Sequence, residues 1–556
     1  MKKIIPALVA LVLIVIIGAV TAGTIVIDKY SYSKERANLQ EYFKVQGDQL
    51  AIFLQDERIP EKALLKEGVC YFDLDTVHKY FNDTFYADIN EGLLLYALPE
   101  EVVRIELASA PDGAAAAYQE DGTVYIAADL VKEYTNFSYE VFDMRMQVYT
   151  QWGQKCTAVV KKDTQVREKG GIKSPILRDI AKDEQVEVLE RMEKWSRVKT
   201  ADAIIGYVEN KNLTEEKTET EVPVTDYEEP AYTTRQLEEK VCLGWHSIGG
   251  VGGNDTLDSV TAIAKGLNVI APTWFSLSDN EGGYESFASR NYVDRAHAKG
   301  LKVWGVLDDF NYNNTHNAGI DVYTVLSSTA SRNRLIGNIV AEAVALGLDG
   351  INLDFEKVNA DCGEHYAQFI RELSVQCRLQ NLTFSIDNYV PFSFNEYLRR
   401  DVQGKVADYV IIMGYDEHWH GSKDPGSVAS IDYVSSGIDK TLEQVPAEKV
   451  VNALPFYSIL WKINGADITD EYLTMNNTAD YLKRIGQSGA WDEDTQQLYV
   501  EWTSGNATYK LWAENEDSIL AKLNVMRARD IAGVAVWRLG YGTPAVWEMI
   551  SAYLGS

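Results

Sequence analysis

The stretch LGLDGINLDFEKV, Leu346–Val358, carries polar and apolar side chains at alternate positions. The polar members are Asn352, Asp354 and Glu356, and the apolar members between them are Ile351, Leu353 and Phe355. A period of two is the period of a β-strand, whose successive side chains point to opposite faces. One face of this strand therefore carries an amide and two carboxylates.

The surroundings of this strand predict that both of its faces are covered. Helix-like runs precede it at 335–346 and follow it at 364–379. A strand between two helices is typical of a parallel sheet. Two carboxylates in a covered interior are costly unless a functional site uses them. The alternative is a solvated edge strand with incidental acids.

The octapeptide DGINLDFE, 349–356, resembles the fourth-strand signature of glycoside hydrolase family 18, which includes chitinases and endo-β-N-acetylglucosaminidases. The family pattern usually has Asp where this chain has Asn352. This departure keeps the acid, Glu356, but changes the hydrogen-bond partner of Asp354. The pH optimum is therefore expected to differ from that of the family.

Composition excludes several classes of function. The 556 residues carry a formal net charge of −29, which argues against nucleic acid as a partner. At this length we expect two to four domains. The five cysteines are scattered and odd in number, so they predict neither a disulfide framework nor a metal cluster. We expect no cofactor.

The N-terminal segment, 1–30, predicts export. Lys2 and Lys3 precede an apolar run that begins at Ile4, which is typical of a signal peptide or an uncleaved signal-anchor helix. Val20-Thr21-Ala22 is a candidate cleavage site, although the length of the run favours an anchor. The remainder is expected to act outside the cytoplasm, at the cell surface or secreted, with the membrane contacted only by this segment.

Two small modules are predicted next. Residues 31–150 resemble the copper amine oxidase N-terminal-like domain and are interpreted as a stalk, with a turn at Asp112-Gly113 and no copper site around His78. Residues 151–212 resemble the bacterial SH3-like barrel, an all-β module in which Trp195 and Tyr207 are candidates for a ligand groove. An acidic linker is predicted at 213–234.

Residues 235–556 alternate strands with helices, which predicts an α/β fold, a (β/α)8 TIM barrel. An additional segment, Glu471–Asp517, predicts a small inserted α+β lobe. The candidate strands are Val241–Trp245, Asn268–Trp274, Lys302–Leu307, Gly350–Glu356, Thr383–Asn388, Tyr409–Tyr415, Val450–Pro455 and Gly533–Trp537.

In such a barrel, the strand ends at one face should supply the site. Met413-Gly414-Tyr415-Asp416 ends the sixth strand and matches the Met-x-Tyr-Asp motif of the family. Several aromatic and amide side chains at other strand ends suit the apolar faces and hydroxyl groups of sugars. The predicted substrate-binding residues are Trp537, Asp416, Met413, Trp274, Asn388, Asn352 and Tyr457.

The resemblance implies a substrate-assisted reaction, in which the 2-acetamido group of the substrate replaces one of the two usual carboxylates. Glu356 is then the acid and base, Asp354 orients the acetamido group, and Tyr415 holds it. Asn352 and Asp349 are expected to support them from beneath.

The resemblance predicts a retaining hydrolase of a polymer containing N-acetylglucosamine (GlcNAc). The predicted surface location of the protein and its SH3-like module favour peptidoglycan as the substrate. The module is expected to contact the cell wall. The alternatives are a secreted chitinase or N-glycan endoglycosidase, and a catalytically silent surface protein that binds glycans.

Overall fold

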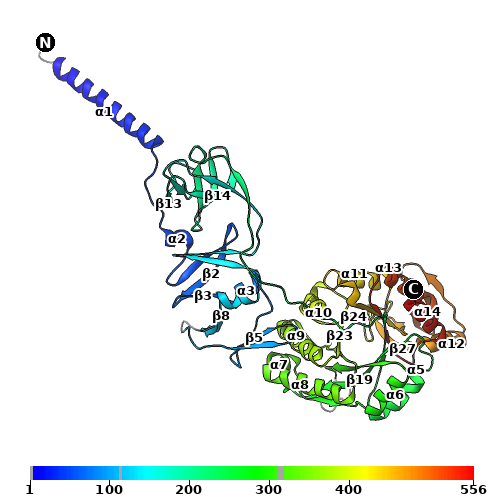
Figure 1. The fold of residues 1–556 in the computed structure, drawn as a ribbon. Coiled ribbons are helices and arrows are strands. Elements are labelled where there is room, and N and C mark those ends of the chain that lie inside the picture. The colour runs from blue at the N-terminus through cyan, green and yellow to red at the C-terminus, as the bar shows by residue number, and fades with distance from the viewer. Residues whose placement is uncertain (1–3, 112–114, 311–318, 556) are drawn as a thin grey trace. The chain divides into compact units, whose positions relative to one another are not determined.

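The computed structural model describes residues 4–111, 115–310 and 319–555 (Figure 1). The predicted turn at Asp112-Gly113 lies outside them. The chain divides into two compact units. The first contains Met1–Phe85 and Ile105–Glu229, and the second contains Tyr86–Arg104 and Pro230–Ser556.

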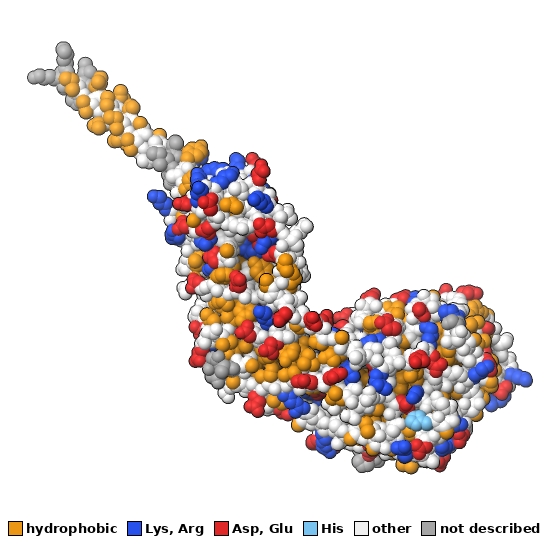
Figure 2. Space-filling view, viewed as in Figure 1, with side chains coloured by type: hydrophobic (Ala, Val, Ile, Leu, Met, Phe, Trp, Pro, Cys, Tyr) orange, Lys and Arg blue, Asp and Glu red, His pale blue; other side chains and the backbone are white. Residues whose placement is uncertain are grey.

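The N-terminal helix α1, Ile4–Tyr30, has exposed apolar side chains between Ile5 and Val20, drawn in orange in Figure 2. In the described part of the chain, no helix is long and apolar enough to cross a membrane.

The first unit contains two seven-stranded sheets. The order of the first sheet is β7-β8-β3-β2-β1-β10-β9. Its strands are β1 (Gln49–Leu54), β2 (Glu57–Lys66), β3 (Val69–Asp73), β7 (Ala117–Glu120), β8 (Thr123–Ala127), β9 (Ser138–Phe142) and β10 (Arg145–Tyr149). The helices of this unit after α1 are α2 (Leu39–Phe43), α3 (Leu74–Tyr80) and α4 (Ala128–Glu133).

The second sheet has the order β13-β12-β16-β15-β14-β11-β17 and contains the region predicted to resemble an SH3 barrel. Its strands are β11 (Gln154–Val159), β12 (Thr164–Arg167), β13 (Ile176–Ile180), β14 (Gln185–Arg191), β15 (Trp195–Lys199), β16 (Ile205–Glu209) and β17 (Lys217–Thr220). Strand β17 lies in the segment predicted as a linker, and it pairs with β11.

The second unit is built on a closed parallel barrel, as predicted. The strand order is β18-β31-β25-β24-β23-β22-β21-β19, and β18 also pairs with β19 to close it. The strands are β18 (Val241–His246), β19 (Val269–Leu277), β21 (Lys302–Asp308), β22 (Gly350–Asp354), β23 (Thr383–Tyr389), β24 (Tyr409–Met413), β25 (Val450–Pro455) and β31 (Gly533–Trp537). Strand β20 (Tyr284–Ser286) adds antiparallel to β19.

Helices surround this barrel (Figure 1). They are α5 (Leu257–Thr261), α6 (Arg290–Ala298), α7 (Val322–Ser327), α8 (Thr329–Leu346), α9 (Gly363–Leu379), α10 (Arg400–Val406), α11 (Ile431–Leu442), α13 (Glu516–Ala528) and α14 (Pro544–Leu554). Helix α8 shows how local sequence sets the boundaries. Ser328 caps its N-terminus by accepting from the Ser331 N–H, and Gly347 ends it in the left-handed conformation. The strand with the acidic motif begins directly afterwards.

The inserted lobe follows β25 and is larger than predicted. It is a sheet of order β27-β26-β30-β29-β28. Its elements are β26 (Tyr457–Asn464), β27 (Asp467–Thr474), α12 (Met475–Ile485), β28 (Ala490–Asp492), β29 (Gln497–Ser504) and β30 (Ala507–Ala513). Leu460, Leu473 and Leu511 are buried in its own small core. The lobe therefore begins at Tyr457, directly beyond the seventh barrel strand.

A segment from far upstream completes the barrel unit. The sheet of β4 (Tyr86–Asp88), β5 (Leu93–Ala97) and β6 (Val102–Glu106) comes from the region predicted as a stalk, and Tyr86–Arg104 groups with the barrel. Asp88 accepts hydrogen bonds from the backbone N–H (2.8 Å) and Oγ1 (2.7 Å) of Thr329, at the start of α8. This strap, Tyr86–Arg104, therefore stabilises the helix that leads into β22.

Candidate active site

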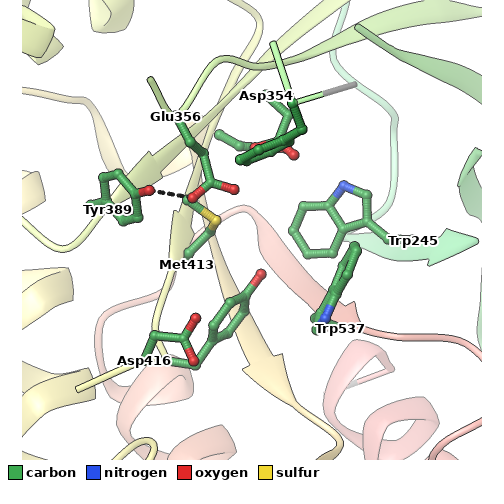
Figure 3. A pocket seen from close by; sticks show the side chains of 10 residues that line it. Trp245, Asp354, Glu356, Tyr389, Met413, Asp416 and Trp537 are labelled. Carbon is green, nitrogen blue, oxygen red and sulfur yellow. Dashed lines mark hydrogen bonds between the residues drawn. The ribbon is translucent and has the colours of Figure 1, made fainter. Parts of the chain in front are cut away.

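A pocket opens at the carboxyl ends of the barrel strands, where the acidic motif ends (Figure 3). Its volume is about 210 Å³. The lining residues are Trp245, Phe310, Asp354, Glu356, Asp387, Tyr389, Met413, Tyr415, Asp416 and Trp537. Four further predicted site residues, which come from distant parts of the sequence, therefore meet Asp354 and Glu356 here: Met413, Tyr415, Asp416 and Trp537.

The position of Glu356 is fixed by the neighbouring strand end. Asp309, which follows β21, accepts hydrogen bonds from the backbone N–H groups of Glu356 (3.0 Å) and Lys357 (2.8 Å). The hydroxyl of Tyr389, at the end of β23, donates to the Glu356 carboxylate. These contacts aim the carboxyl group into the pocket, as Figure 3 shows.

Glu356 can hold a proton near neutral pH. Burial raises the pKa of its carboxyl to about 7, and the hydrogen bond from Tyr389 opposes part of this rise. The nearby carboxylates of Asp309, Asp416 and Asp308 raise the pKa further. A carboxylic acid with a pKa in this range can donate a proton to a leaving group and later accept one from water.

Asp354 stands two positions earlier on β22. Burial raises its pKa well above the usual range, and the charges of Glu356 and Asp387 add to the effect. Its Oδ1 atom is buried and has no hydrogen-bond partner among the described residues. Such a buried oxygen without a partner can accept a hydrogen bond from a ligand or take up a proton.

The opposite wall carries the sixth-strand motif. Burial raises the pKa of the Asp416 carboxyl, although the hydroxyl of Tyr457 donates to its Oδ1 at 2.5 Å. Tyr415 is buried beside it and lines the pocket. Trp537 meets Trp245 edge-on, with ring centroids 6.0 Å apart. These two indoles provide an apolar surface of the kind that packs against sugar rings.

Asn352 lies beneath the pocket, as predicted, and is fully buried. Its amide nitrogen donates to Asp387 Oδ1 (2.8 Å) and Ser385 Oγ (3.0 Å). Its side-chain oxygen accepts from the indole nitrogen of Trp245 (3.0 Å). The residue that departs from the family pattern is thus the centre of a polar network below Asp354.

The structure does not place three predicted residues at the site. Trp274 belongs to β19 and is buried, and its indole nitrogen donates to Asn254 Oδ1 (2.8 Å). Asn388 points to the outer side of the barrel and exchanges hydrogen bonds with Gln403 of α10. Asp349 precedes β22 at the other end of the barrel, where it accepts from His297, Lys302 and the Val303 N–H. Trp274 and Asn388 lie away from the pocket because neighbours in sequence alternate between the two covered faces of a strand, and Asp349 lies away from it because it precedes β22.

The pocket also contains residues that the sequence reasoning did not select: Asp387, Tyr389, Trp245 and Phe310. The polar alternation of Ser385 and Asp387 within an apolar strand was a signal for an inward-facing pair. Trp245 ends a predicted barrel strand and Tyr389 directly follows one, which was also a signal, whereas Phe310 lies outside the predicted strands. Within the described residues, no group of His, Cys, Asp and Glu side chains has the arrangement of a metal site.

Comparison with protein families agrees with this geometry. The model described as "Glycosyl hydrolases family 18" matches residues 276–542, and the model described as "Bacterial SH3 domain" matches residues 162–214. The resemblance of residues 31–150 to a copper amine oxidase N-terminal-like domain stays a prediction.

Curated relatives cover the same region. The "Uncharacterized glycosylase YvbX" of Bacillus subtilis (strain 168) is 25% identical over 310 residues, which are 54% of this chain and 88% of the relative. The "Cortical fragment-lytic enzyme" of Bacillus anthracis is 25% identical over 239 residues, 41% of this chain. The match spans only about half, 54%, of that enzyme's length.

Solved structures have the same fold. A chitinase from Chromobacterium violaceum aligns with a TM-score of 0.51 and 22% identity, covering 57% of this chain and 99% of that one. The spore cortex-lytic enzyme SleL of Bacillus cereus aligns with a TM-score of 0.51 and 21% identity, covering 59% and 76%. With its acidic strand end, its barrel and its matching family model, this chain carries a glycosyl hydrolase family 18 domain, matched over residues 276–542, and a bacterial SH3 domain, matched over residues 162–214.

Proposed function

We propose that this chain is a retaining, substrate-assisted glycosidase that cleaves β-linked GlcNAc in peptidoglycan. The observation that carries the proposal is the pair Asp354 and Glu356 at one strand end in the pocket, where burial raises the pKa of Glu356 to about 7. Both acids approach a bound sugar from the same strand. The 2-acetamido group of the substrate would then supply the nucleophile.

The proposed reaction has two steps. Glu356 donates its proton to the glycosidic oxygen while the acetamido carbonyl oxygen attacks the anomeric carbon, and the bond to the leaving sugar breaks. The product is an oxazolinium ion, whose positive charge lies beside the Asp354 carboxylate. Glu356, now ionised, takes a proton from a water molecule that attacks the anomeric carbon from the face of the departed sugar. The configuration is therefore retained.

The other pocket residues hold the reacting sugar. Trp537 and Trp245 offer it an apolar floor, and the Tyr415 hydroxyl is placed to hold the acetamido oxygen. Asp416 is fixed by Tyr457 on the wall opposite β22. Exclusion of water by these buried side chains strengthens the attraction between Asp354 and the oxazolinium ion.

Peptidoglycan is the preferred substrate for two reasons. The chain resembles enzymes described as cortical fragment-lytic over 41% of its length. It also carries a bacterial SH3 domain at residues 162–214. Such a substrate lies outside the cytoplasm, so we propose extracytoplasmic action.

The test uses the whole chain and its Glu356→Gln variant on purified peptidoglycan and on chitooligosaccharides, with product masses recorded. New reducing GlcNAc ends from peptidoglycan, lost in the variant, are expected. Preference for chitooligosaccharides would instead indicate a chitinase. Binding without turnover would indicate a glycan-binding protein. Efficient cleavage of an equivalent glucoside without the acetamido group would exclude substrate assistance.

We further propose that the SH3 domain holds the enzyme on the cell wall through Trp195 and Tyr207, which are both partly exposed. In a Glu356→Gln background, replacing these two residues by alanine should reduce co-sedimentation with insoluble wall. Thermal unfolding of the same variant separates lost binding from lost folding. Unchanged sedimentation of a folded variant would contradict this role.

A further inference from the structure

Two oxygen atoms on neighbouring strands lack hydrogen-bond partners. Asp354 Oδ1 and Asp387 Oδ2 are both buried, and neither has a partner among the described residues. Leu353 pairs with Ile386 in the β22–β23 register, so the two aspartates occupy the next positions along adjacent strands. Both side chains line the catalytic pocket.

Asn352 decides which oxygen of Asp387 remains available. Its amide donates to Asp387 Oδ1 at 2.8 Å, which occupies that atom and leaves Oδ2 without a partner. The amide itself is held by Trp245, which donates to its oxygen, and by Ser385. The orientation of Asp387 is therefore fixed by a network that does not include Asp354.

Two buried carboxylates at adjacent positions do not both ionise, because neither charge is compensated. One proton between them would give each orphaned oxygen a partner. Further negative charge surrounds the pair and favours that proton. The titratable groups that influence the pair are Glu356 on the β22 end, Asp308 and Asp309 on the β21 end, Tyr415 after β24 and Tyr366 on α9.

We propose that Asp387 is the positioning residue of Asp354, and that the two carboxyl groups share one proton between Asp354 Oδ1 and Asp387 Oδ2. This inference rests on the proposed function. When the oxazolinium ion forms, the proton resides on Asp387 and Asp354 carries the full negative charge. No electrons are transferred, and the proton returns when the product leaves. Asp387 on β23 thus holds or releases the proton that sets the charge of Asp354 on β22.

The network allows a swap experiment on the full chain. In Asp387→Asn, Asp354 loses its partner, so kcat should fall at least tenfold with little change in KM, and the acidic limb of the pH profile should move. In the double variant Asn352→Asp/Asp387→Asn, a carboxyl group returns beside Asp354 and the hydrogen bond between positions 352 and 387 is kept with its direction reversed. At least part of the lost kcat should be recovered.

Asn352→Asp alone is the matched control, because it adds a third buried carboxyl and should lower activity. The proposal is overturned if Asp387→Asn keeps the wild-type kcat and pH profile. It is also overturned if the folded double variant is no more active than Asp387→Asn. Thermal unfolding identifies variants that fail to fold.

A second measurement does not depend on turnover. Infrared spectra of the protein labelled with ¹³C-aspartate, recorded at pH 7.5, where Asp309 with its pKa of about 6 is ionised, should show a protonated aspartic acid in the wild type and in Glu356→Gln, and its band should be shifted or lost in Asp387→Asn. Its absence from the wild type would overturn the shared proton even if the enzyme cleaves peptidoglycan. Its presence with no cleavage would instead overturn the proposed function alone.

A hollow of about 480 Å³ lies beside the catalytic pocket. It shares Asp416 and Trp537 with that pocket, so a glycan chain can continue from one into the other. Arg538 is the one Lys or Arg among the described residues that line the hollow. Its guanidinium lies over the Tyr541 ring, 4.4 Å from the centroid, and donates to the Tyr541 hydroxyl.

No carboxylate among the described residues forms an ion pair with Arg538. Stacking on Tyr541 orients the planar guanidinium, whose remaining N–H groups suit a carboxylate. In peptidoglycan, alternate sugars carry a lactyl group, whose carboxyl is amide-linked where a peptide is attached and is a free carboxylate where the peptide has been removed, whereas the sugars of chitin carry no lactyl group. The geometry points to Arg538 as the binding residue for the free lactyl carboxylate of a peptide-free sugar next to the cleaved GlcNAc, an assignment that also rests on the proposed function.

The test compares Arg538→Gln and Arg538→Lys with the wild type on peptide-free peptidoglycan glycan strands, whose lactyl carboxyls are free, and on chitooligosaccharides of equal length. Arg538→Gln should lower kcat/KM about tenfold or more on glycan strands and less than threefold on chitooligosaccharides. Wild-type enzyme on strands with esterified lactyl groups should match Arg538→Gln on native strands. Equal losses on both substrates, or none on either, would overturn the assignment. A wild type that cleaves chitooligosaccharides and not peptidoglycan would overturn the proposed substrate instead.

Discussion

Glu514 and Asp354 are both buried acids of the barrel unit, and they differ in the hydrogen bonds that they receive. Glu514, between β30 and α13, accepts from Lys522 Nζ (2.9 and 3.0 Å), Gln497 (2.6 Å) and Ser518 (2.6 Å). Asp354 has an oxygen without a partner and faces other acids. The first arrangement stabilises a lobe, whereas the second leaves a carboxyl oxygen without a partner in the proposed substrate pocket.

This difference predicts that changes at the two places act on different properties. A satisfied buried charge contributes to the fold, because removing one partner leaves the other unpaired. A buried carboxyl group without a hydrogen-bond partner in the protein contributes to catalysis instead, because it can interact with the substrate or take up a proton.

Glu356→Gln should give the largest effect. The amide has the shape of the acid and cannot donate a proton to the leaving oxygen, so kcat should fall about 1,000-fold. Reducing-end release measures the loss. Thermal unfolding should show no loss of stability, since the change removes a buried charge among other acids. A clear loss of stability would contradict the comparison.

Glu514→Gln should act on the fold instead. It leaves the ammonium of Lys522 buried beside a neutral amide, at a cost of about 3–5 kcal/mol in the free energy of unfolding. Denaturant unfolding measures this cost, and Glu493→Gln, an exposed acid in the same lobe, is the control. The activity of the folded fraction should be unchanged. A loss of activity larger than the loss of folded protein would contradict this assignment.

Asp88→Ala tests a satisfied acid on the strap. It removes the two hydrogen bonds to Thr329 at the start of α8 and should cost about 1–2 kcal/mol. The exposed Glu101 of the same strap provides the control variant, Glu101→Ala. Equal unfolding midpoints for the two variants would show that the strap does not stabilise the barrel. A fragment that starts at residue 235 lacks the strap and should be less stable than the chain.

Tyr389→Phe should give the smallest effect, a shift in pH dependence. Glu356 must be protonated to act as an acid, so wild-type activity should fall as the pH rises through about 7. The hydrogen bond from Tyr389 lowers the Glu356 pKa, so its removal should raise this pKa and move the basic limb to higher pH. A pH–rate profile of both proteins checks the direction. A shift to lower pH would contradict it.

Much of the fold could be predicted from the sequence. The eight predicted barrel strands and the SH3 region all occur, with boundaries that differ by a few residues. Strand periods, Gly and Asp at turns, and helix caps are local signals that the chain carries in order. The strap could not be predicted, because its docking depends on contacts between Asp88 and Thr329, 241 positions apart.

For the site, the sequence determined the acids Asp354 and Glu356 and the sixth-strand motif, since each is a contiguous pattern with a recognisable spacing. Only the tertiary structure decided that Asp387 faces inward and Asn388 outward, and that the Tyr389 hydroxyl reaches Glu356. Both faces of a barrel strand are covered, so hydrophobicity does not reveal which face is inside. The register between strands and the closure of the barrel determine which side chains on different strands come into contact. No single stretch of sequence contains this information.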